Sequence, residues 1–142
     1  MRKFGLAILA ALFAVPVLAD DKIGIFETIY QSSASVDESA AAIEGAAADS
    51  SLLLDGALDV RVPDDAQQAK VFVLTSPDFI DAARAETPRT ISAQILRVAV
   101  FTWGDEQKTV VNMANPVAHA MVYYADSPNY DELVTAAGVA AG

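Results

Sequence analysis

Three side chains that can bind a soft metal lie within nine residues of one another, around a single Asn-Pro pair. They are Met113, His119 and Met121, and the chain has no other histidine. Thioether and imidazole groups suit Cu(I), and a His/Met pair also serves as the axial ligand set of haem. The same residue types commonly fill cores or lie on surfaces, and we favour this packing interpretation. A copper or haem role is therefore the alternative hypothesis, and it requires that the three side chains converge.

Convergence depends on the secondary structure of residues 117–124, VAHAMVYY. In a strand, His119 and Met121 project from the same face, whereas in a helix His119 neighbours Tyr123 instead. The segment is compatible with a short helix and with a short strand. Both geometries remain open at this point.

Four aromatic residues form a second candidate site. Phe101 and Trp103 precede an expected hairpin turn, and Tyr123 and Tyr124 follow the histidine. Such rings can floor a small-ligand pocket, but aromatic residues are also enriched in cores and at subunit interfaces. We therefore expect core or dimer contacts in preference to a pocket.

The remaining residues do not form a catalytic constellation. The chain has no cysteine, which excludes disulfides, thiol nucleophiles, iron–sulfur clusters and thiolate zinc sites. No G-x-S-x-G turn occurs, and the glycines are too scattered to form a phosphate-binding loop. The pair Asp37-Glu38 lies in an expected first helical turn, where it complements the helix dipole. We expect a protein that is not an enzyme and that carries no cofactor.

The first 19 residues have the form of an export signal. Arg2 and Lys3 precede an apolar segment over residues 4–15, and Val17 and Ala19 occupy the −3 and −1 positions of a cleavage site. The apolar segment is shorter than the about 20 residues that a membrane-spanning helix needs. We expect cleavage after Ala19, a periplasmic or secreted protein, and no membrane attachment after cleavage.

The mature chain is strongly acidic. Removal of 19 residues from 142 leaves 123, over residues 20–142, which is a usual size for a single domain. Two of the nine basic residues leave with the signal, so the mature net charge is 7 − 19 = −12. This charge repels nucleic acid and anionic lipid surfaces, and it suits solubility or a basic periplasmic protein partner.

A β-hairpin is the expected centre of the fold. Residues 95–103 and 109–111 are predicted strands joined at Gly104-Asp105, and Asn115-Pro116 ends the second strand. Both parities of the first strand are apolar. We expect both of its faces to be buried, either under helices or at a subunit interface.

Other strands and helices flank this hairpin. Strands are expected over residues 23–30 and 71–75, and residues 52–62 predict either a hairpin or one bulged strand. Helices are expected to begin at the capping box Ser35-x-x-Glu38, at Ser76-Pro77 and at Ser127-Pro128, and they end near residues 47, 86 and 138. The order predicts a single α+β domain, with a largely antiparallel sheet of about five strands and two to three helices packed on it.

Several segments of the chain resemble the DUF302 family of small α+β domains. They are FVLTSPDFIDAA, LRVAVFTWGDEQKTVV, Asn115-Pro116 and DSPNYDELV. The resemblance spans roughly the mature chain and implies the fold and a homodimer, but no activity. Many relatives carry a cysteine before the first proline motif and a Pro-Cys at the hairpin strand, where this chain has Thr75 and Ile95-Leu96. Thiol chemistry therefore cannot be carried over to this protein.

Together these features predict an exported, acidic, non-enzymatic binding or accessory module of unknown ligand that forms a homodimer. The alternative is a copper or haem protein that uses His119, Met121 and Met113.

Overall fold

A five-stranded antiparallel sheet organises the computed structural model, which describes residues 23–61, 68–104 and 108–142. The expected export signal, residues 1–19, lies outside these ranges. All four neighbouring strand pairs are antiparallel, in the spatial order β1-β5-β4-β3-β2. The strands are β1 (Phe26–Ser32), β2 (Leu53–Asp59), β3 (Ala69–Thr75), β4 (Ile95–Trp103) and β5 (Lys108–Ala114). This arrangement confirms the predicted α+β class and antiparallel sheet.

The predicted hairpin lies at the centre of the sheet. Strands β4 and β5 pair from Val98 opposite Met113 to Trp103 opposite Lys108. Gly104 follows β4 with a φ of 77°, a left-handed conformation that costs glycine little. The hairpin forms because two β-branched and aromatic runs flank a residue that permits the turn.

Both edge strands contain a bulge. The pairing of β1 with β5 shifts between Thr28 and Tyr30, and that of β2 with β3 shifts between Leu54 and Gly56. Of the two structures predicted for residues 52–62, the single bulged strand is therefore correct. The Asp55-Gly56 pair makes a bulge here because the chain continues in the same direction after it.

Helix α1 (Val36–Asp49) covers one face of the sheet. Its N-terminus is the predicted capping box: the Glu38 N–H donates to Ser35 Oγ at 3.2 Å, and the Ser35 N–H donates to Glu38 Oε2 at 2.8 Å. Val36, Ala40 and Ala47 are buried against the strands. We call this side of the sheet the closed face.

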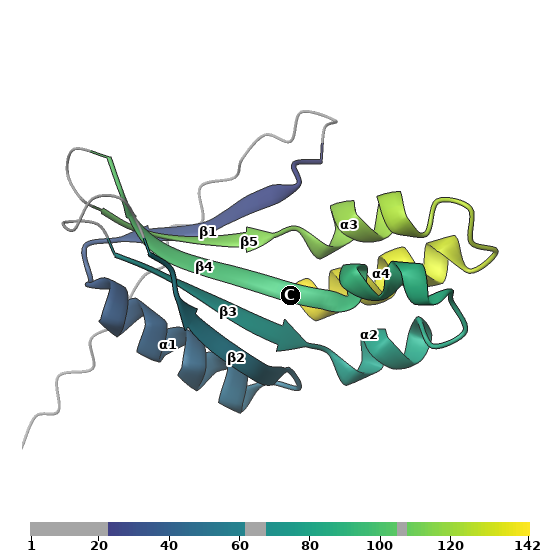
Figure 1. The fold of residues 1–142 in the computed structure, drawn as a ribbon, viewed down its shortest axis with the longest axis horizontal. Coiled ribbons are helices and arrows are strands. Elements are labelled where there is room, and N and C mark those ends of the chain that lie inside the picture. The colour runs from purple at the N-terminus through teal and green to yellow at the C-terminus, as the bar shows by residue number, and fades with distance from the viewer. Residues whose placement is uncertain (1–22, 62–67, 105–107) are drawn as a thin grey trace, which may run out of the picture.

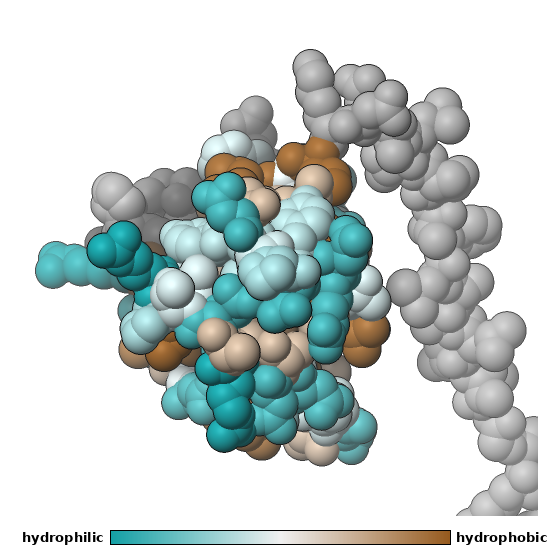
Figure 2. Space-filling model, turned by 90° about the vertical axis from the view of Figure 1, so that its right-hand side faces the viewer, coloured by the Kyte–Doolittle hydropathy of each residue, from teal (hydrophilic) through white to brown (hydrophobic). Residues whose placement is uncertain are grey.

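The other helices gather at one end of the sheet, beyond the ends of β3 and β5 (Figure 1). They form a second core around Phe79, Tyr124 and Leu133. Figure 2 looks onto this end and shows mostly hydrophilic residues, with apolar residues toward its margins. In the described residues, no helix is long and apolar enough to cross a membrane. These helices are α2 (Pro77–Ala82), the 3-10 helix η1 (Pro88–Gln94), α3 (Pro116–Tyr123) and α4 (Tyr130–Ala141).

Several element boundaries differ from the sequence prediction. Helix α2 is shorter than expected, and η1 follows it where the prediction had a direct connection to the hairpin. Residues 117–124 are helical because Asn115 caps α3, its Oδ1 accepting from the N–H groups of Val117 and Ala118 at 3.0 and 3.2 Å. Helix α4 begins after Asn129, and Ser127 accepts from the Asn129 N–H in the preceding turn.

Candidate functional site

An apolar groove of about 600 Å³ lies on the closed face, between α1, the sheet and the C-terminal end of α4. Five strands about 4.8 Å apart span roughly 19 Å, whereas one helix is only about 10 Å wide. Helix α1 contacts β2, β3, β4 and β5, with most of these contacts on β2 and β4. A single helix therefore leaves part of the closed face uncovered, and the groove occupies that part.

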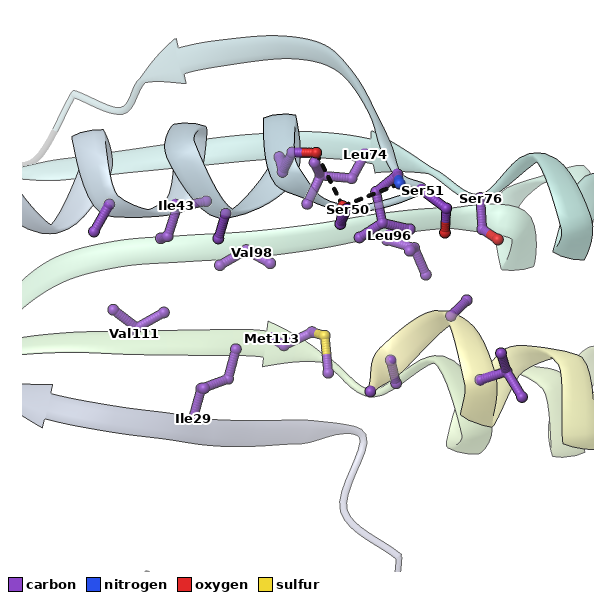
Figure 3. A pocket seen from close by; sticks show the side chains of 18 of the residues that line it. Ile29, Ile43, Ser50, Ser51, Leu74, Ser76, Leu96, Val98, Val111 and Met113 are labelled. Carbon is purple, nitrogen blue, oxygen red and sulfur yellow. Dashed lines mark hydrogen bonds between the residues drawn. The ribbon is translucent and has the colours of Figure 1, made fainter. Parts of the chain in front are cut away.

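Buried aliphatic side chains form the floor of the groove. Leu74, Leu96, Val98, Val111 and Met113 come from the three central strands β3, β4 and β5, and all five are buried. Figure 3 shows Leu96 and Val98 on one strand and Val111 and Met113 on the neighbouring strand, all beside the cavity. Their register places them on one face because every second residue of a strand points to the same side.

The walls of the groove come from elements that are distant in sequence. Ala42, Ile43 and Ala46 line it from α1, and Ile29 lines it from the bulge of β1. Figure 3 shows Ile43 and Ile29 on opposite sides of the cavity. Val139, Ala140 and Ala141 close it from α4. The alanines of α1 are important here, because larger side chains at those positions would fill the space.

Polar groups gather at one end of the groove. Ser50, Ser51 and Ser76 lie near Leu96, on the side of the cavity away from Ile29 (Figure 3), and Asp78 also lines the cavity. The Ser50 hydroxyl donates to the Ala47 carbonyl at 2.9 Å and accepts from the Leu52 N–H at 3.1 Å. Ser76 Oγ accepts from the Phe79 N–H at 3.3 Å as the cap of α2. The groove is therefore amphipathic along its length.

The opposite face of the sheet, which we call the open face, is apolar in its middle part and carries Arg97 and Lys108 toward its two ends. One row across it runs from Leu58 through Val71 and Ala99 to Asn112. Leu58 is 60% exposed and Trp103 is 69% exposed, while Val71, Val73 and Phe101 are half-buried. In the paired residues of the described strands, no carboxylate projects from this face.

The three soft-metal candidates lie on different elements. Met113 is buried in the groove floor on β5, whereas His119 and Met121 lie on α3. Two residues along a helix are separated by about 200°, so His119 and Met121 point away from each other. The His119 ring lies 6.3 Å from that of Tyr123, as the helical alternative predicts. The three side chains therefore do not share one face of a strand or helix.

His119 lies partly buried on α3. Burial, and then the nearby positive charge of Arg97, lower the pKa of His119 below 6.5. Among the described residues no group of three or more His, Cys, Asp or Glu side chains could hold a metal. Copper or haem binding stays a prediction, which titration of the wild type and of His119→Ala with Cu(I) and haem tests.

The four predicted aromatic residues separate into three environments. Tyr124 is 1% exposed and packs edge-to-face on Phe79 in the second core. Phe101 and Trp103 meet edge-to-face at 6.4 Å at the hairpin end of the open face, and Tyr123 is exposed on α3. Tyr124 is thus a core residue, and the four rings do not form one pocket.

Sequence reasoning missed the groove. Its lining comes from α1, four strands and the end of α4, so no local motif identifies it. One signal was available, since residues 40–48 are almost all small. A helix of small residues over a sheet of larger ones leaves unfilled space when nothing else covers the strands.

Comparisons with known proteins point to one fold. No family model matches the sequence, and no curated protein matches it. A solved structure, the uncharacterized conserved protein DUF302 from Bacillus stearothermophilus, is similar with a TM-score of 0.64 and 13% sequence identity. The similarity covers 80% of this chain and 89% of that chain. The chain therefore has a DUF302-like fold.

Proposed function

We propose that this protein is an exported, non-enzymatic binding module that holds an apolar ligand in the groove and works as a homodimer. The observation that carries the proposal is the groove of about 600 Å³ with its floor of buried aliphatic side chains. Ligand pockets usually measure about 300–1,000 Å³ and are lined mainly by apolar groups, with a few polar groups that orient the ligand.

The lining favours binding over catalysis. It consists of aliphatic side chains, alanines, three serines and two ionisable side chains, Tyr30 and Asp78. Burial of apolar surface contributes roughly 25 cal/mol per Å², so a ligand that fills the groove gains affinity from its hydrocarbon part. Chemistry at a bond would need further nucleophilic or acid–base groups around it.

A fluorescent apolar probe, 1-N-phenylnaphthylamine, tests ligand binding by the mature protein. The Ala46→Phe variant places a ring in the groove and should weaken probe binding at least about tenfold, because the ring occupies the volume that the probe needs. Ala41→Phe makes the same change on α1 at an exposed residue that does not line the groove. It should leave the affinity unchanged.

Two results would contradict a ligand-binding groove. One is the absence of saturable fluorescence with the wild type. The other is an equal loss of affinity in both variants, which would indicate binding elsewhere or a general loss of structure. Circular dichroism of both variants establishes that they fold.

The open face supports the homodimer. Five strands that span roughly 19 Å and run for about 23 Å give a projected area of roughly 440 Å², and the accessible area of the corrugated surface is larger. A standard interface buries about 800 Å² per partner, so a dimer through this face would use most of it. The full chain carries 19 acidic residues, yet the paired residues of the described strands place none of them on this face. The charged side chains that the strand pairing does place on this face are Arg97 and Lys108, toward the two ends of the central strands. A second copy can pack face to face over the apolar part between them, as in a β-sandwich.

Mass in solution tests the homodimer, and a monomer at high micromolar concentration would contradict it. Export has a separate test. Protein recovered from the periplasm or the medium should begin at Asp20, which N-terminal sequencing measures.

A further inference from the structure

Two helix C-termini point into the groove. Helix α1 ends at Asp49 with Ser50 as its cap, and α4 ends at Ala141. Ser50, Ser51, Ala140 and Ala141 all line the cavity. A helix C-terminus carries about half a negative charge because its last carbonyls lack intrahelical partners. Neither helix has a basic residue in its last turn. The two C-termini therefore add negative potential at this end of the groove, while the N-terminus of the six-residue helix α2 adds potential of the opposite sign beside Asp78.

Asp78 adds a full negative charge to the same lining. Its side chain belongs to the first turn of α2, next to the buried cap Ser76. Asp78 forms no ion pair with any described residue. A ligand with a positive head group would supply the partner that the described part of the chain does not.

The serines of this end offer few donors to an anion. Ser50 Oγ already donates to the Ala47 carbonyl, which leaves the hydroxyl protons of Ser51 and Ser76, and Ser76 Oγ also accepts from the Phe79 N–H. A carboxylate head group would need several free donors, and it would lie beside Asp78 and two helix carbonyl ends. The lining thus opposes fatty acids and other anionic chains, although their hydrocarbon part fits.

We propose that the groove selects single-chain amphiphiles with a cationic head group, of which a long-chain primary amine is the model. The alkyl chain lies on Leu96, Val98 and Val111, and the ammonium donates to Asp78 and to the helix carbonyls. This inference rests on the proposed function of the groove and specifies the class of its ligand.

Displacement of bound 1-N-phenylnaphthylamine by three chains of equal length tests the inference. Dodecylamine, dodecanol and dodecanoate are added to the mature protein at pH 7, below the concentrations at which they form micelles. Alkyl ammonium and carboxylate groups are both charged at this pH. The amine should bind about tenfold more tightly than the carboxylate, with the alcohol between them.

A pair of variants separates the local charge from the general acidity of the protein. Asp78→Asn should reduce the preference for the amine about threefold, the range of an exposed ion pair. Asp81→Asn is the matched control on the same helix: Asp81 is paired with Arg84 and does not line the groove. It removes the same net charge and should leave the preference unchanged.

The outcomes distinguish this inference from the proposed function. If the probe binds but dodecanoate binds as tightly as dodecylamine or more tightly, the preference for a cationic head group is wrong, while the proposed apolar groove is supported. Equal effects of the two Asn variants would also overturn it, because the preference would then arise from net charge. If neither the probe nor any chain binds, the proposed function itself fails.

Discussion

The two faces of the sheet are built from the same strands but lie in different environments. On β4, Leu96, Val98 and Val100 point to the closed face and are buried, whereas Ile95 and Trp103 point to the open face and are exposed. Both sets are apolar. What differs is the cover, because α1 packs over only one face.

This difference shows that apolar residues on both faces of a strand do not by themselves predict burial of both faces within one molecule. The pattern predicts that both faces need a partner, but it does not say whether the partner belongs to the same molecule. On the closed face the partner is α1, and the groove is the part that α1 leaves open. On the open face, within the described residues, no helix has the role of α1.

The largest expected difference between the faces is in stability. Phe72→Ala removes a side chain that is 0% exposed in the closed-face core, and should lower the free energy of unfolding by about 3–5 kcal/mol. Phe101 is half-buried on the open face, so Phe101→Ala should lower the free energy of unfolding of the dilute monomer clearly less. Urea unfolding measures both, and equal losses would show that the open face is as well packed as the closed one.

A charge on the open face should break the proposed dimer. Val71 lies on β3 of that face between Leu58 and Ala99, and Val71→Glu would bury a carboxylate in the proposed interface. The dimer dissociation constant should rise on the order of 100-fold. Sedimentation equilibrium measures it, with Ala41→Glu on the outer side of α1 as the control. An unchanged constant for Val71→Glu in a folded variant would place the interface elsewhere.

Removal of the capping box of α1 should lower stability through the closed face alone, because α1 packs only there. Ser35→Ala removes the hydroxyl of the capping box and should cost about 1 kcal/mol of stability. Hydrogen bonds from the Ser35 backbone, and then from its hydroxyl, lower the pKa of Glu38 below 4.5. The stabilisation from ionised Glu38 is therefore present above pH 4.5 and lost as the pH falls through the lowered pKa.

The measured quantity is the difference in stability between wild type and Ser35→Ala as a function of pH. We expect it to narrow in acid, because protonation of Glu38 weakens the same capping box in the wild type. A gap that stays constant well below pH 4 would show that ionised Glu38 does not support the cap.

The smallest expected effect is on the pKa of His119, at the end of the sheet where the helices gather. Arg97 projects from the open side of β4, and its charge contributes to the lowered pKa of His119. Arg97→Gln should raise this pKa toward 6.5, with the effect of burial remaining. The sequence contains one histidine, so NMR follows it directly, with Arg84→Gln as the control. An unchanged pKa would show that the charge of Arg97 does not affect His119.

His119 also has a small pH effect of its own. Since its folded pKa is lowered, the neutral ring is the stable form. The associated stability is present above 6.5 and is lost as the pH falls through the lowered pKa.

Local signals in the sequence predicted much of the fold. The capping box at Ser35 and Glu38, the cap at Ser76 and the central hairpin are confirmed, because each depends on residues close in sequence. Helix η1 was missed: the Thr87-Pro88 signal ended one helix and also began the next. Residues 117–124 were ambiguous because the apolar pattern fitted two periods, and the Asn115 cap favoured the helix.

The candidate site could not be predicted in the same way. The groove depends on how far α1 extends across five strands and on where the end of α4 arrives, which are long-range properties. The predicted cluster at Met113, His119 and Met121 relied on closeness in sequence. The turn at Asn115-Pro116 changes the strand into a helix between the first residue and the other two, and so separates them.

The bulges of the two edge strands affect how the protein behaves at high concentration. An exposed regular edge is a template on which another chain can add a strand, and such additions have no natural end. Both edges of this sheet carry a register shift, at Thr28/Tyr30 in β1 and at Leu54/Gly56 in β2. Because a bulge interrupts the ladder of hydrogen bonds, growth along the edges is disfavoured. The proposed homodimer uses the open face in place of the edges, and an association of that kind closes after two molecules and does not continue into fibres.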